Sequence, residues 1–256
     1  MITNFKYVFF ILTCVFLVNY ASFELQSLDI KIYVNEDASA SVAEEFNLLI
    51  RGDESIQLYE ESLRTLDRNN IQEWFSKIQL PSLVYHIGGQ QVQVDNLAIL
   101  PEPAQTVYQQ GYAKMTITYD VIAPPKSSKI TNFNETTQTG LFFLHSLKPR
   151  TTKYVINKKA FLNINEDGDL IFPKNTALTF ILPEGSIVTD VSPLPNNLEE
   201  KRTPFYADSL TWYKQILPRF TLEFEVEGTL ESEIVAFFSS IQDILSEKAM
   251  GYEGLP

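Results

Sequence analysis

Apolar and polar residues alternate along much of the chain, and this period of two predicts β-strands. After residues 1–23, alternation begins at Leu28 and runs to Val34, breaks at the turn "NEDA", and resumes between Val42 and Ile50. Further stretches of this kind lie at 91–100, 112–124, 141–147, 153–172, 177–191, 209–216 and 219–228. Short strands at such regular spacing predict a mainly β fold made of antiparallel β-sandwich (Ig-like) lobes.

The period changes from two to that of a helix between residues 54 and 79. Apolar side chains recur there at helical spacing, and Asn70 with Glu73 forms a capping-box pattern ahead of a second short helix. We therefore expect a helical insertion at 54–79. Such an insertion either closes one end of the core or offers a site for a protein partner.

A second amphipathic segment lies at 231–250, after the last predicted strand. Its apolar stripe consists of Ile234, Phe237, Ile241, Ile244 and Leu245. The segment is too short and too charged to span a bilayer, so we expect a C-terminal amphipathic helix. It packs on the sandwich, lies on a membrane, or docks a partner through residues 231–248.

The polar, turn-rich stretch 124–140 predicts a long loop or a domain boundary. The predicted organisation is therefore a β-rich lobe at 24–125 that contains the helical insertion, a second sandwich lobe at 140–230, and the terminal helix. The boundary leaves open whether there is one lobe or two.

The N-terminal segment 1–23 has the pattern of a signal peptide or an uncleaved signal-anchor. A single positive charge, Lys6, precedes an apolar run from Tyr7 to Val18. The cleavage site is poor, because a cut after Ala21 would place Asn19 where signal peptidase prefers a small residue. If the apolar run extends to Phe23, it has about 17 residues, which is the lower limit for a helix that spans the membrane. We expect export or anchoring with the body outside the membrane, and the alternative is a buried N-terminal strand.

Charge and cysteine content exclude several classes of function. The net charge is −12, with 32 acidic against 20 basic residues, and this repels the phosphate backbone of nucleic acids. The only cysteine, Cys14, lies in the apolar run, so intrachain disulfides and cysteine-ligated zinc are excluded. We expect no cofactor.

Residues 163–170, "NINEDGDL", partly match a calcium-binding loop through Asn163, Asn165 and Asp167. However, Asn163 stands where such loops begin with Asp, and Lys174 stands where they have a bidentate Glu. The dipeptide Asp-Gly is also typical of a hairpin turn, which is the favoured interpretation.

Catalysis has no positive support in the sequence. The two histidines, His86 and His145, lie in strand-like contexts and are expected to be packing residues. "YHIGGQ" is loosely similar to an oxyanion loop, but no G-x-S-x-G turn occurs. Glu44 and Glu45 are adjacent on a predicted strand and therefore point to opposite faces.

One N-glycosylation sequon is present, "NET" at Asn134 in the polar loop. In an exported protein, a loop asparagine of this kind is accessible for modification. Asn134 is therefore a candidate glycosylation site.

The hairpin "IKIYVNEDASASVAEEF" resembles the start of the exported part of a broad group of predicted membrane proteins of unknown function, common in archaea. "FILPEGSIVTDVSPLP", "SLTWYK" and "RFTLEFEVEG" are similar to the second half of the same group. The likeness covers about residues 24–245. It implies a surface-exposed β-sandwich and no catalytic residues, with anchoring here through the N-terminal segment.

These observations favour a non-enzymatic, exported or membrane-anchored protein of the cell envelope that acts as a binding or structural module. Two alternatives remain. An accessory subunit of a membrane complex would present exposed apolar residues on the 54–79 helices or the 231–248 helix. An extracytoplasmic hydrolase would have a pocket with convergent polar groups near His86 or His145.

Overall fold

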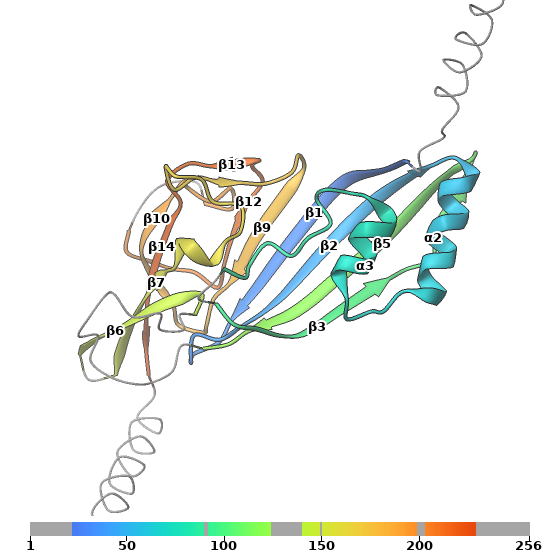
Figure 1. Ribbon diagram of the computed structural model, residues 1–256. Coiled ribbons are helices and arrows are strands. Elements are labelled where there is room, and N and C mark those ends of the chain that lie inside the picture. The colour runs from blue at the N-terminus through green and yellow to red at the C-terminus, as the bar shows by residue number, and fades with distance from the viewer. Residues whose placement is uncertain (1–21, 90–91, 124–139, 149, 199–202, 229–256) are drawn as a thin grey trace, which may run out of the picture. The chain divides into compact units, whose positions relative to one another are not determined.

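The computed structural model describes residues 22–89, 92–123, 140–148, 150–198 and 203–228 (Figure 1). These residues form mainly β-strands arranged in several sheets, so the predicted mainly β fold is confirmed. The strands are β1 (Ser22–Val34), β2 (Ala40–Arg51), β3 (Val94–Pro101), β4 (Gln105–Val107), β5 (Gln110–Val121), β6 (Phe142–Lys148), β7 (Thr151–Ile156), β8 (Leu170–Ile171), β9 (Thr176–Ile181), β10 (Ile187–Ser192), β11 (Phe205–Tyr206), β12 (Ser209–Trp212), β13 (Ile216–Leu217) and β14 (Thr221–Glu227).

The largest sheet has seven strands in the order β12-β9-β1-β2-β5-β3, with β4 paired to β5. A five-stranded sheet has the order β11-β10-β14-β7-β6, and β13 pairs with β8. The ladder between β1 and β9 is parallel, with Leu28 opposite Thr176, which departs from the antiparallel expectation. These two strands are far apart in sequence, and a parallel pair needs such a long connection.

The chain divides into two compact units, and each is discontinuous in sequence. The described part of unit 1 consists of residues 22–26, Phe46–Val84 and Ile99–Thr116. Unit 2 consists of Ser27–Glu45, Tyr85–Ala98 and the described residues from Ile117 onward. This division does not follow the predicted lobes 24–125 and 140–230, because β1, β2, β3 and β5 each contribute residues to both units.

Unit 1 contains both described α-helices, α2 (Asp53–Thr65) and α3 (Ile71–Ile78), where the helical insertion 54–79 is predicted. Tyr59 and Trp74 are fully buried, and each polar tip donates to a backbone carbonyl at 2.8 Å. The side chain of Asn70 caps α3 by accepting from the amide of Gln72. Among the large apolar residues of these helices only Phe75 is clearly exposed, so the apolar stripes mainly close the core.

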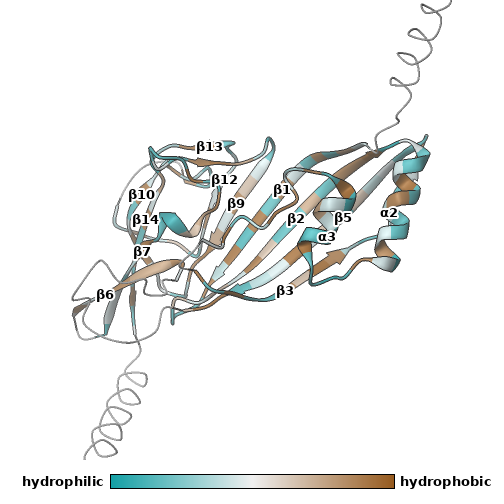
Figure 2. Cartoon of the chain, in the orientation of Figure 1, coloured by the Kyte–Doolittle hydropathy of each residue, from teal (hydrophilic) through white to brown (hydrophobic). Residues whose placement is uncertain are grey.

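Unit 2 is sandwich-like, because aromatic side chains from two different sheets pack against one another. Phe180 of β9, in the seven-stranded sheet, lies 6.3 Å from Phe142 of β6, in the five-stranded sheet, measured between ring centroids. Within the five-stranded sheet, Tyr154 of β7 stacks with Phe224 of β14 at 4.6 Å. The same cluster includes Phe220 and Trp212, both fully buried. Figure 2 shows hydrophilic and hydrophobic residues following one another along the strands, as the period of two predicts.

Several predicted features lie outside the described residues. These are the apolar run, the terminal helix 231–250, the long loop and Asn134. β1 begins at Ser22, so Ser22 and Phe23 belong to the folded body and not to the N-terminal segment that the sequence predicts at 1–23. Among the residues with a described structure, no helix is long and apolar enough to cross a membrane.

Candidate functional site

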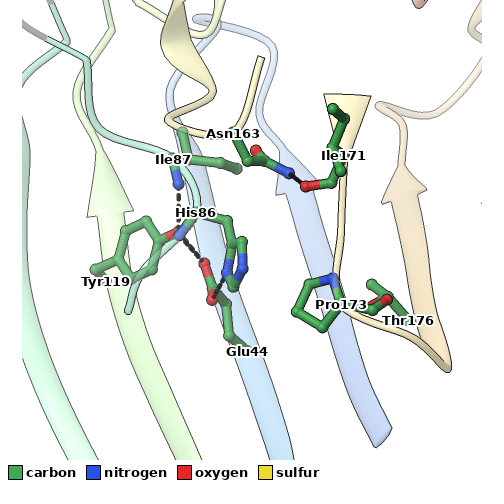
Figure 3. A network of polar contacts seen from close by, with 8 residues as sticks. All are labelled: Glu44, His86, Ile87, Tyr119, Asn163, Ile171, Pro173 and Thr176. Carbon is green, nitrogen blue, oxygen red and sulfur yellow. Dashed lines mark hydrogen bonds and ion pairs between the residues drawn. The ribbon is translucent and has the colours of Figure 1, made fainter. Parts of the chain in front are cut away.

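Three polar side chains meet in the interior of unit 2, and they come from three separate parts of the chain (Figure 3). Glu44 lies on β2, Tyr119 on β5, and His86 in the segment between α3 and β3. β2 and β5 are neighbours in the seven-stranded sheet, so Glu44 and Tyr119 reach the same side of it from adjacent strands. We call these three residues the Glu44 cluster.

The carboxylate of Glu44 is the centre of this cluster. Its Oε1 accepts the backbone N–H of His86 at 2.7 Å and the hydroxyl of Tyr119 at 2.5 Å. Its Oε2 lies 2.7 Å from Nδ1 of His86. The hydroxyl of Tyr119 also accepts the backbone N–H of Ile87 at 3.2 Å. Both carboxylate oxygens are thus engaged within the protein.

All three side chains of the cluster are buried: Glu44 is 0% exposed, Tyr119 2% and His86 4%. A buried carboxylate is tolerated when its oxygens are hydrogen-bonded, and here both oxygens have partners within the protein. Burial and the Glu44 carboxylate raise the pKa of Tyr119 well above its ordinary value. The phenol therefore stays protonated and remains a donor to Glu44.

The backbone around His86 is held by a second set of bonds. Gly88 donates to the carbonyl of Ala160 at 2.8 Å, and Leu162 donates to the carbonyl of His86 at 3.0 Å. A Cβ on Gly89 would lie 2.3 Å from the carbonyl oxygen of Lys159, so only glycine permits this approach. The amide of Gly88, which an oxyanion loop would leave open for a substrate, already has a protein acceptor.

The Glu44 cluster serves to hold the backbone at residues 86–87 in place. The Glu44 cluster fastens residues 86–87 to two strands of the sheet through side-chain and backbone bonds together. Of the two histidines, His86 is therefore a buried, bonded residue, in agreement with the packing interpretation. That interpretation is wrong for His145, which lies exposed on the edge strand β6 opposite Lys153.

The candidate metal ligands Asn163, Asn165 and Asp167 lie in a hairpin turn. The side-chain amide of Asn163 donates to the backbone carbonyl of Ile171 at 2.7 Å (Figure 3). The backbone N–H of Asn165 donates to the backbone carbonyl of Asp169 at 3.0 Å. Gly168 closes the turn at φ 82°, the left-handed region.

Side chains of this hairpin are largely committed to the turn itself. The carboxylate of Asp169 accepts from the backbone N–H of Arg219 and from the side chain of Asn165, and these two bonds lower its pKa. The Oδ1 atom of Asn163 is buried with no partner among the described residues. Across the described part of the chain, no three His, Cys, Asp or Glu residues are placed to share a metal ion.

The Glu44 cluster was not anticipated as a unit. In the sequence, Glu44 shares one strand face with Val42 and Phe46, and a lone acid on an apolar face is a signal that the acid is buried with a polar partner. His86 was the available partner. What the sequence did not reveal is that the segment 85–89 folds back over β2 and β5.

A shallow hollow lies beside α3 in unit 1 and is lined by Leu66, Gln72, Glu73, Ser76 and Lys77. Neither His86 nor His145 lines this hollow.

No known protein family matches the sequence, and no curated protein matches it either.

Proposed function

We propose that this protein is an exported or membrane-anchored cell-envelope protein whose folded body acts as a non-enzymatic binding or structural module. The observation that carries the proposal is the order of the first residues: a positive charge at Lys6, an apolar run to Val18, and the first strand of the body at Ser22. This order is typical of a chain that enters a membrane during synthesis and folds beyond it.

The structural role of the body is supported by the Glu44 cluster. Its acid, histidine and phenol are the kind of groups that hydrolases use, but here they bond to one another and to backbone amides. Their positions stabilise a packed segment. This supports the structural module over the alternative of an extracytoplasmic hydrolase.

The architecture we propose for the body is that of Ig-like sandwich lobes. The support comes from unit 2, where β10, β14, β7 and β6 form an antiparallel sheet with alternating burial, and an aromatic core lies against it. Sandwiches of this kind commonly serve as rigid scaffolds on cell surfaces and present their binding groups on loops.

The test is fractionation of cells that produce the full chain with a C-terminal tag, followed by protease treatment from outside and intact-mass analysis. We expect the protein in the membrane or extracytoplasmic fraction, accessible to the protease. Retention of Met1 would identify an anchor, and a new N-terminus near Ser22 a cleaved signal.

The matched control replaces Leu12 and Val15 by arginine, because two charges in the apolar run should block membrane entry while leaving the described body unchanged. A wild-type protein found intact in the cytosol with Met1 in place would refute the proposal.

A further inference from the structure

The hairpin between β4 and β5 in unit 1 presents an almost fully exposed aromatic side chain. Val107 pairs with Gln110, so the turn consists of Tyr108 and Gln109. Tyr108 is 97% exposed, and Val107 and Tyr112 beside it are about half exposed. Large apolar side chains gathered at one tip are typical of a contact surface.

The backbone of this turn is unusual for its residues. Tyr108 has φ 48° and Gln109 φ 62°, both in the left-handed region that turns of this kind usually fill with Asn and Gly. The tip therefore keeps a bulky aromatic residue where a small residue would fit with less strain. An outlier of this kind is a reason to look for a function.

The tip also lacks charge. Residues 103–113, between Glu102 and Lys114, contain no acidic or basic side chain, in a chain that is 20% charged. An uncharged strip with exposed tyrosines matches the composition that protein surfaces show at the level of lipid headgroups.

Hydrogen bonds within unit 1 place this tip at the end of the unit where β1 begins. The amide of Ser22, the first residue of β1, donates to Oγ of Ser55 at 3.0 Å in the first turn of α2. Gly52, the residue that precedes α2, donates to the carbonyl of Gln109 at 3.4 Å. Ser22 and the tip thus flank the same turn of one helix.

The apolar run ends at Val18, four positions before Ser22. Four residues span at most about 14 Å when extended. If the run enters a membrane, Ser22 must lie within that distance of the membrane surface, and the tip lies beside Ser22.

We propose that Tyr108, with Val107 and Tyr112, rests in the headgroup region of the membrane that the N-terminal run enters. This inference depends on the proposed anchoring. The hydroxyl of Tyr108 would remain in contact with water, and its ring would contact the acyl chains and the glycerol groups of the lipids. Asp53 and Glu54, exposed at the start of α2, would repel anionic lipids, so the fitting surface is zwitterionic.

The test uses the full chain reconstituted in phosphatidylcholine vesicles, with Tyr108→Trp as the reporter. The two native tryptophans, Trp74 and Trp212, are 0% exposed and give a constant background. The emission of the new tryptophan is expected to shift to the blue on vesicle binding and to lose intensity with brominated lipid. Tyr206→Trp, at a position that is 77% exposed in unit 2, is the control for an exposed tyrosine outside the tip.

The outcomes separate the two proposals. If the protein does not float with the vesicles, the anchoring itself is refuted. If it floats but the reporter at 108 is quenched no more than the control at 206, the anchoring stands and the headgroup contact is refuted. A reporter that is shielded from iodide only in native membranes, and not in vesicles, also refutes it and identifies a protein partner. Tyr112→Trp repeats the measurement should the first variant fold poorly.

Discussion

Tyr119 donates its hydroxyl proton to Oε1 of Glu44 across 2.5 Å, and neither side chain is more than 2% exposed. The same phenol oxygen accepts the backbone N–H of Ile87. Tyr119 therefore connects a buried carboxylate to the backbone of the segment that carries His86. If either side chain is removed, polar groups remain in the interior without their partners, and this loss is larger than the net gain of making the bonds.

Replacing Glu44 by alanine is expected to lower the free energy of unfolding by about 3–5 kcal/mol, because the hydroxyl of Tyr119 and the backbone N–H of His86 would remain buried without an acceptor, at about 1–3 kcal/mol each. Glu44→Gln keeps the shape and one acceptor oxygen, so a smaller loss of about 1–2 kcal/mol is expected. Urea unfolding followed by the emission of the buried tryptophans measures both losses.

The neighbouring acid provides the control for this series. Glu45 points to the other face of β2 and is partly exposed, so water can replace its interactions, and Glu45→Gln is expected to lower the free energy of unfolding by less than Glu44→Gln. Equal losses at positions 44 and 45 would contradict the role assigned to the Glu44 cluster.

Tyr119 should also affect stability at high pH. Burial and the Glu44 carboxylate raise its pKa in the folded protein well above 10, the ordinary value that the unfolded chain keeps. Above pH 10 the unfolded state releases a proton that the folded state retains, so the free energy of unfolding falls by up to about 1.4 kcal/mol per pH unit from this group. Below pH 10 the contribution is fully present.

The variant Tyr119→Phe should therefore show a shallower fall in stability above pH 10 than the wild type, together with a loss of about 1–3 kcal/mol at neutral pH. Unfolding curves between pH 8 and about pH 11, the range that brackets the ordinary phenol pKa, measure the slope. Tyr206→Phe, which removes an exposed hydroxyl, serves as the control. Parallel slopes for Tyr119→Phe and the wild type would show that the phenol does not retain its proton.

Local patterns predicted the strands and helices well, because each depends on a period that residues carry themselves. The alternation Leu28 to Val34 falls inside β1, and the helical spacing after Asp53 falls inside α2. The parallel ladder of β1 with β9 was not predictable in this way. It joins residues separated by about 150 positions, and no local period records which distant strand will be the neighbour.

The candidate site shows the same limit. The alternation groups Glu44 with Val42 and Phe46, and Tyr119 with Ile117 and Val121, but the contact between Glu44 and Tyr119 depends on β2 and β5 being neighbours. The position of His86 depends further on Gly88 and Gly89, which allow the segment to approach residues 159–160 closely. The glycines were visible in the sequence, whereas the backbone that they approach was not.

The hairpin at 163–171 is expected not to bind calcium. Its side chains already close the turn: Asn163 donates to Ile171, and Asp169 accepts from Asn165 and Arg219. A calcium site needs six or more oxygen ligands, and this turn offers few that are uncommitted. Isothermal titration of the full chain with calcium should give only the heat of dilution. A saturable heat that disappears in Asp167→Asn would overturn this expectation.

The β4–β5 hairpin should become more stable when Tyr108 or Gln109 is replaced by the residue usual in such a turn, Asn or Gly. Gln109→Gly removes a side chain from φ 62°, and Tyr108→Asn places a residue that tolerates φ 48°. Each change is expected to raise the free energy of unfolding by about 1 kcal/mol, because left-handed backbone costs other residues about that much. Gln105→Gly, in the adjoining strand β4, is the control and should lower it, because glycine weakens a strand. If Tyr108→Asn raises stability in solution but weakens the association of the full chain with phosphatidylcholine vesicles, then the strained aromatic residue is retained for its contact and not for the fold.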